Sequence, residues 1–200
     1  MEKNWIIENL SKKLITTDNL DANAAVLVLL RAVDQELQVL LVKRAEKSTD
    51  PWSGQIAFPG GKRDTEDKNL KETIIRETLE ETGLNIVVRC RFLGAMESVR
   101  STQRPEMKIL PFVVLQEKEQ EIKLNEELTE YFWTPLEEMD RNKGCVKYRS
   151  ENFPAFIMGG NNIWGLTYRI LHNLLALLSS FEKETQREAG LFTSKKMLIF

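Results

Sequence analysis

The feature that most limits the fold of this chain is a pair of short apolar runs near its start. Ala24–Ala32 and Leu37–Lys43 are apolar and favour β structure, and the polar Val33–Glu36 separates them. Two such runs around a short polar turn are typical of a β-hairpin. The longest strictly apolar stretch is Ala24–Leu30, whereas a transmembrane helix needs about 20 such residues. We therefore expect these runs to begin a sheet in a soluble protein.

Apolar spacing and turn signals predict the remaining elements. We expect helices over 5–15, Lys68–Thr82, Leu136–Asp140 and Ile163–Phe181, and strands over Gln55–Phe58, Ile86–Val99, Lys108–Gln116, Glu121–Leu124 and Tyr131–Trp133. Gly83 is expected to end the second helix, and Thr134 to cap the third, with Pro135 in its first position.

Residues 141–163 look irregular, and the tail from Glu182 is polar. No repeat, linker or low-complexity segment divides the chain. The order of elements favours a single α/β domain with a mixed sheet over residues 1–200. Its core spans about residues 22–180, with the first helix and the tail as extensions.

The composition limits the classes of partner and metal that the chain can bind. Lys and Arg number 28 and Asp and Glu 30, a net charge of −2, so the chain as a whole does not attract nucleic acid or an anionic membrane. It has two cysteines, Cys90 and Cys145, and one histidine. A metal would therefore be held by oxygen, which favours magnesium, manganese or calcium. With no secretory signal at the start, we expect a cytoplasmic protein with reduced thiols.

The most informative stretch is Arg76–Leu84, which reads RETLEETGL. At about 100° per residue, Glu80 lies about 60° from Glu77 on one side and Glu81 about 40° on the other. Like charges at this spacing repel, and the end of a helix disfavours anions. A divalent cation would turn this cost into a gain, although a solvated acidic surface is the commoner reason for such a face.

Two adjacent glycines precede the acidic helix, in the segment Phe58–Asp64. Gly60 and Gly61 allow backbone carbonyls to approach a cation or a phosphate closely. A plain tight turn would use the same residues, so the glycines indicate a binding site only in combination with the acidic helix.

Together these residues resemble the Nudix hydrolase family, whose signature is G-x5-E-x7-R-E-U-x-E-E-x-G-U, with U aliphatic. Arg76–Leu84 matches each fixed position, although Thr78 stands at the first U. The first half departs: counting from Gly61 reaches Asp67, and counting from Gly60 reaches Glu66, so both are candidates for the first acid. The resemblance implies an α/β/α sandwich with a mixed sheet.

A second resemblance is to the coenzyme A diphosphatase branch of that family, whose motif L-L-T-x-R-(S/A)-x3-R-x3-G-x3-F-P-G-G precedes the signature. The leucines of 40–45, Arg44, Gly54 and the FPGG of 58–61 correspond. Val42 replaces the threonine, the spacing to Gly54 is one residue longer, and Thr49 or Asp50 stands where the motif has its second arginine. Residues 163–170 also resemble this branch.

The family resemblance implies hydrolysis of a diphosphate by attack of water on phosphorus, with Mg²⁺ or Mn²⁺ as cofactor. Glu77, Glu80 and Glu81 correspond to the metal-binding glutamates, and the carbonyl of Gly60 or Gly61 is a further expected ligand. Arg76 is expected to orient the first acid, Asp67 or Glu66, by an ion pair.

The general base is left open. Glu127 is the first choice, Glu126 the second, and Glu80 or Glu81 the alternative within the helix; a plain polar loop would also explain Asn125–Glu130.

For the substrate we expect contacts from Gly60 and from Arg44, Arg100, Arg104 and Trp52. The alternatives are that Arg44 is a cation at a strand end, that Arg100 and Arg104 are solvated, and that the indole of Trp52 packs locally. The expected substrate is coenzyme A or a related small nucleotide diphosphate. ADP-ribose, dinucleotides, nucleotide sugars and nucleoside triphosphates are alternatives, as is a nucleotide sensor without catalysis. The apolar end Met197–Phe200 makes a homodimer plausible.

Overall fold

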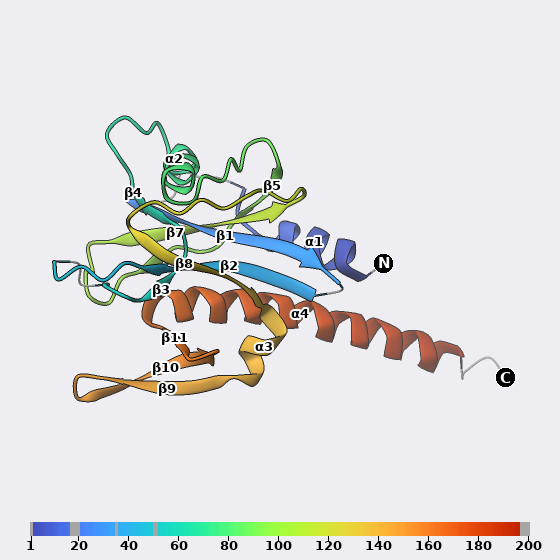
Figure 1. Ribbon diagram of the computed structural model, residues 1–200. Coiled ribbons are helices and arrows are strands. Elements are labelled where there is room, and N and C mark those ends of the chain that lie inside the picture. Colours follow the sequence, from blue (N-terminus) through green and yellow to red (C-terminus); the bar gives the residue numbers. More distant parts are fainter. Residues whose placement is uncertain (1, 17–20, 35, 50–51, 197–200) are drawn as a thin grey trace.

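A computed structural model describes residues 2–16, 21–34, 36–49 and 52–196, of which 2–4 and 182–196 are described by their backbone alone. Figure 1 shows the order of the elements. The helices are α1 (Glu2–Lys13), α2 (Leu70–Thr82), α3 (Leu136–Arg141) and α4 (Gly165–Lys196). The strands are β1 (Ala24–Val33), β2 (Glu36–Arg44), β3 (Ile56–Ala57), β4 (Gly60–Lys62), β5 (Cys90–Ala95), β6 (Val99–Arg100), β7 (Lys108–Gln116), β8 (Leu128–Pro135), β9 (Lys143–Tyr148), β10 (Glu151–Met158) and β11 (Asn161–Trp164).

The first eight strands form one mixed sheet with the path β3-β2-β1-β7-β5, in which β4 also pairs with β1, β6 with β7 and β8 with β2. The predicted hairpin is β1 and β2, paired antiparallel with Leu30 opposite Val39. Among the strand pairs of the described residues, only β1 and β7 run parallel, with Leu27 opposite Phe112. The mixed sheet expected from the order of the elements is therefore confirmed.

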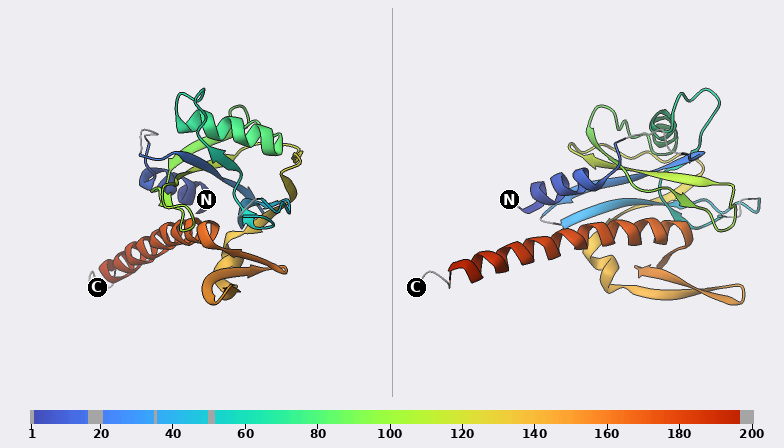
Figure 2. Two further views of the ribbon diagram at one scale, coloured as in Figure 1. Left: turned by 90° about the vertical axis from the view of Figure 1, so that its left-hand side faces the viewer. Right: turned by 180° about the vertical axis from the view of Figure 1, so that it is seen from behind.

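Both faces of the sheet are covered, and β1 shows why its sequence is apolar at successive positions. Leu27 and Leu29 face a core shared with α2, whereas Val28 and Leu30 face a core shared with α1 and α4. Because neighbouring side chains of a strand point to opposite faces, a strand covered on both faces must be apolar throughout. Figure 2 shows α2 on one side of the sheet and α4 on the other, so the fold is an α/β/α sandwich.

Helix α2 begins and ends where local chemistry dictates. The side chain of Asn69 accepts a hydrogen bond from the Glu72 N–H, which caps the first turn. Gly83 has φ of +70° and its N–H donates to the Leu79 carbonyl, the left-handed ending that glycine tolerates best. The predicted helix thus starts two residues later than expected and ends at the expected residue.

Some of the expected elements are wrong. Residues Glu121–Leu124 form no strand, because the Lys123 N–H donates to the carbonyl of Thr82 at 2.8 Å and the segment serves the end of α2 instead. Thr134 does not cap α3: it pairs with Val39 as part of β8, and Pro135 takes the cap position without a side-chain bond.

Residues 141–163 are not irregular but form a second antiparallel sheet, β11-β10-β9. Its alternation is hidden by Gly144, Pro154 and Gly160, yet Phe156 and Ile163 are buried and join the core beneath α4. The residues from Glu182 continue α4 rather than leaving it as a tail, whereas Met197–Phe200 lie outside the described residues. In the described part of the chain, no helix combines the length and apolarity that crossing a membrane requires.

Candidate active site

The adjacent glycines of the sequence, Gly60 and Gly61, lie where the short strand β4 of the sheet meets the acidic helix α2. Gly60 and Gly61 belong to β4, which pairs with β1 opposite Val26 and Ala25. Gly60 has φ of +138°, and a Cβ there would collide with the backbone of Ala25. A Cβ on Gly61 would lie 2.5 Å from Cδ of Glu77. Glycine is therefore required at Gly60, whereas a side chain at Gly61 would have to displace the helix carboxylate that occupies the space.

Glu81 points into this contact. Its side chain is buried, at 5% exposure, and its Oε2 accepts a hydrogen bond from the Gly60 N–H at 2.8 Å. Burial raises the pKa of Glu81 to about 7, against the lowering effects of that hydrogen bond and of Arg44. An anion of this kind is costly to bury without a partner, so the position favours a cation or a proton.

Glu77 lies beside Glu81 and shares its environment. Burial also raises the pKa of Glu77, and the neighbouring guanidinium of Arg76, 2.9 Å from its Oε1, acts in the opposite direction. Glu80 points outward, with 56% of its side chain exposed, and its Oε2 lies 3.2 Å from Arg76. The three glutamates thus divide into two that face the glycines and one at the rim.

The structure decides which acid precedes the signature arginine. Arg76 Nε and Nη2 donate to the two carboxylate oxygens of Asp67 at 3.2 and 2.9 Å. Asp67 is buried, at 7% exposure, and also accepts from the Asp64 N–H. The ion pair lowers the pKa of Asp67 to about 2 and raises that of Arg76. Glu66 is exposed, so Asp67 takes the place of the first acid.

The loop before β8 brings Glu127 towards the same place. The Asn125 N–H donates to the Glu81 carbonyl at 3.0 Å, and the Asn125 side chain accepts from the Glu127 N–H at 2.9 Å. The charge of Glu127 contributes to the raised pKa values of Glu77 and Glu81. Glu127 therefore lies within electrostatic reach of both carboxylates. Sequence reasoning missed Asn125, which positions this loop.

Of the residues predicted to contact the substrate, the structure brings only some close to the glutamates. Arg44 lies at the end of β2, where its N–H donates to the Gln55 carbonyl at 3.0 Å and its charge acts on Glu81. Arg104 stacks over Trp52, with its Cζ 4.9 Å from the ring centre. Arg100 is exposed and donates to the Pro105 carbonyl at 3.3 Å, so this contact holds its side chain within its own loop.

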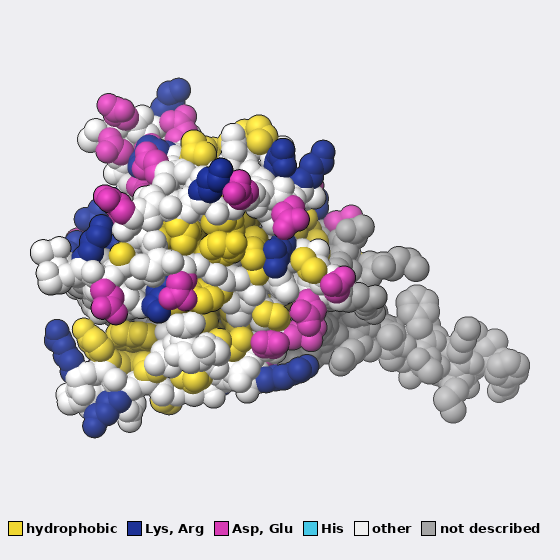
Figure 3. All heavy atoms as spheres, in the orientation of Figure 1, with side chains coloured by type: hydrophobic (Ala, Val, Ile, Leu, Met, Phe, Trp, Pro, Cys, Tyr) yellow, Lys and Arg dark blue, Asp and Glu magenta, His cyan; other side chains and the backbone are white. Residues whose placement is uncertain are grey.

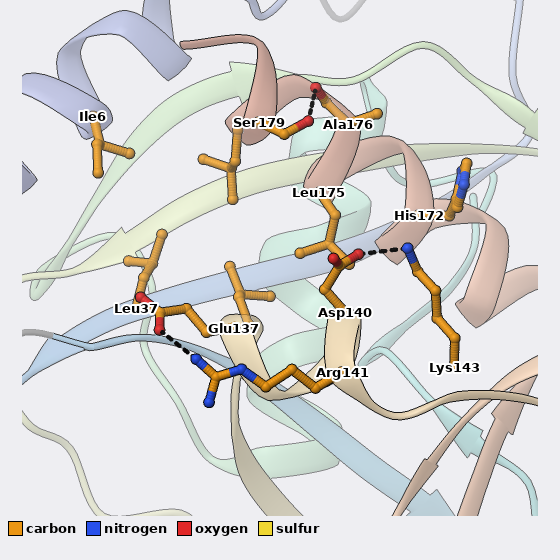
Figure 4. Close-up of a pocket in the computed structure, with 12 residues that line it drawn as sticks. Ile6, Leu37, Glu137, Asp140, Arg141, Lys143, His172, Leu175, Ala176 and Ser179 are labelled. Atoms are coloured by element: carbon orange, nitrogen blue, oxygen red, sulfur yellow. Dashed lines mark hydrogen bonds and ion pairs between the residues drawn. The ribbon is translucent and has the colours of Figure 1, made fainter. Parts of the chain in front are cut away.

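Two pockets lie outside the glutamate site. The first, about 510 Å³, is lined by Leu37, His172 and other residues of α1, α3 and α4 (Figure 4). Leu37 and Arg44 lie near opposite ends of β2, separated by about 23 Å at about 3.3 Å per residue, so this pocket is remote from the glutamates. The second, about 450 Å³, is lined by Gln103, Arg104, Tyr148 and Arg149.

Tyr148 and Arg149 were missed by sequence reasoning because the segment that holds them looked irregular. The local signal is weak, because the aromatic residues Tyr148, Phe153 and Phe156 recur at spacings of five and three rather than at the period of two that indicates a strand. Only the pairing of β9 with β10 places them at a turn facing another loop.

Within the described residues, no three His, Cys, Asp or Glu side chains converge as a ready-made cation site. Arg76 instead forms ion pairs with Glu77 at 2.9 Å and with Glu80 at 3.2 Å. The site therefore consists of one buried and one partly buried carboxylate against a glycine pair, with a third carboxylate at the rim.

The chain is similar to known proteins of one family. The NUDIX domain model matches residues 21–154. The mitochondrial coenzyme A diphosphatase NUDT8 of Homo sapiens is 32% identical over 166 residues, which cover 79% of this chain and 70% of that protein. The peroxisomal coenzyme A diphosphatase ndx-8 of Caenorhabditis elegans is 35% identical over 119 residues, 58% of this chain and 50% of that protein.

Among solved structures, the MutT protein from Methanosarcina mazei Go1 aligns with a TM-score of 0.48 and 24% identity, over 84% of this chain and 99% of that one. The family match covers more than half of the chain and includes β4, α2 and the loop that holds Glu127. The enzyme class and the sandwich fold expected from the signature are confirmed. The chain belongs to the Nudix hydrolase family.

Proposed function

We propose that this Nudix hydrolase is a divalent-cation-dependent diphosphatase acting on coenzyme A or a closely related nucleoside diphosphate derivative. The observation that carries the proposal is the pair of carboxylates held against the glycine pair of β4, the partly buried Glu77 and the buried Glu81. Their raised pKa values report negative charge that the protein alone leaves poorly compensated. A diphosphate substrate with a bound cation supplies the missing positive charge.

The residues present fit Mg²⁺ or Mn²⁺. All the donors are oxygens, as these cations prefer: the carboxylates of Glu77, Glu80 and Glu81 and the carbonyl of Gly61. Glu80 is exposed enough to turn away from Arg76 towards the other two. When bound, the cation would offset phosphate charge and lower the pKa of a bound water.

The chain's own residues then serve the attack of water on phosphorus. Glu127 is the proposed base: its carboxylate takes the proton from the water as the new P–O bond forms, and the bond to the bridging oxygen breaks. The bridging oxygen leaves on the second phosphate. Arg44 is proposed to hold a substrate phosphate by charge-assisted hydrogen bonds, and the Asp67–Arg76 pair keeps the helix carboxylates in register.

The coenzyme A substrate class is supported by two observations. Residues 40–61 resemble the motif of coenzyme A diphosphatases, and relatives of that name are 32% and 35% identical to this chain. This chain lacks the second arginine of that motif, which is the reason to test other diphosphates. ADP-ribose, dinucleotides, nucleotide sugars and nucleoside triphosphates are therefore the competing substrates.

The test is a product-resolved hydrolysis assay with Mg²⁺ and with Mn²⁺. The panel holds coenzyme A, acyl-coenzyme A, ADP-ribose, NADH, nucleotide sugars and nucleoside triphosphates. We expect coenzyme A to yield 4′-phosphopantetheine and adenosine 3′,5′-bisphosphate. Glu81→Gln should abolish this turnover, whereas Glu121→Gln, at an exposed carboxylate paired with Lys123, serves as the matched control and should retain it.

Other outcomes would correct the proposal. Preferred turnover of another diphosphate would reassign the substrate and leave the site intact. Full activity in Glu81→Gln would remove the glutamate pair from catalysis. Tight binding of one compound without turnover, with either metal, would make the protein a nucleotide sensor.

A further inference from the structure

We propose that the pocket between the 101–107 loop and the β9–β10 turn binds a second phosphate group of the substrate, one carried by a ribose hydroxyl of its nucleoside. The proposal deepens the proposed function, on which it rests for its role in turnover. The binding itself can be tested without catalysis. It makes this pocket the part of the protein that selects nucleotides phosphorylated on the ribose.

The lining of the pocket has the chemistry of an anion site. Among the described residues, the four that line its volume of about 450 Å³ are Gln103, Arg104, Tyr148 and Arg149, two cations without an acid. Figure 3 shows Lys and Arg side chains gathered beside hydrophobic ones at its lower left, the end of the molecule where Figure 1 places the β9–β10 turn. Planar guanidinium groups bind phosphate with two parallel hydrogen bonds.

Arg104 is held in place for this task. The N–H of Ser101 donates to the Met107 carbonyl at 2.9 Å, and the N–H of Met107 donates to the Arg104 carbonyl at 2.8 Å, so the loop closes on itself. The Arg104 N–H also donates to Oγ of Ser101. The guanidinium lies over Trp52 at 4.9 Å. A preorganised cation loses little side-chain entropy when it binds an anion.

Arg149 lies at a turn position whose backbone conformation is more stable with a residue other than arginine. It follows Tyr148, the last residue of β9, and β10 begins at Glu151, so it is the first residue of a two-residue turn. Its φ is +56°, a conformation that Gly and Asn adopt more readily than arginine. The guanidinium lies 5.5 Å from the ring centre of Tyr148. Such strain is often found where a side chain has a binding role.

Tyr148 supplies a flat surface beside these cations. Its ring packs on Trp164 with 4.8 Å between centres and on Phe153 with 6.5 Å, yet Tyr148 itself remains 36% exposed. A partly exposed aromatic ring that is packed against other rings suits the stacking of a nucleobase. The pocket therefore combines a surface for a base with two groups for a phosphate.

The pocket is connected to the proposed reaction centre through named contacts. Trp52, under Arg104, accepts at its carbonyl from the Gln55 N–H at 3.1 Å, and Gln55 in turn accepts from the Arg44 N–H. Arg44 acts on Glu81. The start of α4, which directly follows the small sheet, is anchored to β3, because Oγ1 of Thr167 donates to the Ile56 carbonyl at 2.9 Å. In the proposed mode of binding, a nucleotide whose diphosphate lies at Arg44 places its nucleoside on the side of Trp52.

The decisive experiment is calorimetric binding of AMP, adenosine 3′,5′-bisphosphate and adenosine 2′,5′-bisphosphate to the full-length protein. We expect the wild type to bind at least one bisphosphate about tenfold more tightly than AMP, as one charge-assisted hydrogen bond pair provides. The 2′ and 3′ compounds show which hydroxyl carries the recognised phosphate. Arg149→Asn, which suits the turn and should fold normally, is expected to remove the preference, and Arg104→Gln to reduce it.

Lys147→Gln is the matched control, because it removes one positive charge from β9 at an exposed position that does not line the pocket. It should keep the preference. Equal affinity of the wild type for AMP and both bisphosphates, or an undiminished preference in Arg149→Asn, would overturn the proposal. Because no turnover is measured, failure of the coenzyme A assay and failure of this pocket are separate results.

Discussion

At the scale of single residues, the pairing of Asp67 with Arg76 organises the start of the site. Asp67 is almost fully buried and receives two hydrogen bonds from one guanidinium. The same guanidinium reaches Glu77 and Glu80. Arg76 therefore orients three carboxylates. Its ion pair with Asp67 also holds the loop that precedes α2.

We expect Asp67→Asn to lower the free energy of unfolding by about 1 to 3 kcal/mol at neutral pH, because a charged hydrogen-bonded pair is lost. The pKa of Asp67 is about 2 in the folded protein and 3.8 ordinarily. A lowered pKa stabilises the fold fully above 3.8, and this contribution disappears as the pH falls from 3.8 towards 2. Urea unfolding at pH 7 and pH 3 should show the difference between the variant and the wild type shrinking.

The control for this measurement is Glu66→Gln, at the neighbouring exposed acid, for which we expect a change within about 0.5 kcal/mol. A difference for Asp67→Asn that is equal at both pH values would contradict the ion-pair explanation.

A second prediction concerns Thr78, the residue at an aliphatic position of the family signature. Its Oγ1 is buried and, among the described residues, has no hydrogen-bond partner. Thr78→Val should stabilise the protein by about 1 kcal/mol, because it removes an unsatisfied hydroxyl at nearly constant volume. Thr82→Val should destabilise it by a similar amount, because Oγ1 of Thr82 donates to the Thr78 carbonyl at 2.6 Å. Thermal unfolding of the two variants should therefore shift in opposite directions.

At the scale of elements, the site is a contact between a three-residue strand and a helix. β4 approaches α2 so closely that its two glycines leave no room for side chains, one because of the β1 backbone and the other because of a carboxylate. The same geometry gives the two positions different consequences when they are changed.

We expect Gly61→Ala to reduce turnover of the preferred substrate by about 100-fold, because a Cβ 2.5 Å from Cδ of Glu77 pushes that carboxylate away. Its stability should change little, since the side chain of Glu77 can move. Gly60→Ala should instead lower the unfolding temperature, because its φ of +138° and the Ala25 backbone cannot adjust. Steady-state kinetics and calorimetry on both variants check this. Wild-type activity in Gly61→Ala would show that the position of Glu77 is not critical.

At the scale of the whole molecule, the layer opposite α2 is closed by two helices from the ends of the chain. Phe181 of α4 is 1% exposed and meets Trp5 of α1 edge to face, with 6.4 Å between ring centres. Leu10 of α1 is fully buried in the same core. The first helix is thus part of the sandwich rather than an extension of it.

Phe181→Ala should lower the free energy of unfolding by about 3 to 5 kcal/mol, the usual cost of a large cavity in a core. Val88→Ala, at a residue that is 68% exposed, should change it by less than about 0.5 kcal/mol. Urea unfolding followed by circular dichroism measures both. A loss below 1 kcal/mol for Phe181→Ala would show that α4 does not hold α1 through this contact.

The sequence by itself determined the features that depend on neighbours along the chain. Helix α2, its ending at Gly83 and the crowding of Glu77, Glu80 and Glu81 follow from a period of about 3.6 residues and from local capping. The β1–β2 hairpin follows from two apolar runs and a short turn. The family signature lies within this local pattern, which is why the fold and enzyme class could be recognised from it.

Only the tertiary structure decided the features that depend on distant segments. Asp67, rather than Glu66, faces Arg76 because the loop before α2 bends it inward. Residues 141–163 form a sheet because β10 finds partners on both sides. Arg104 and Arg149, 45 positions apart by their numbers, line one pocket because that sheet reaches the 101–107 loop. Such contacts arise from packing between elements, which no local periodicity encodes.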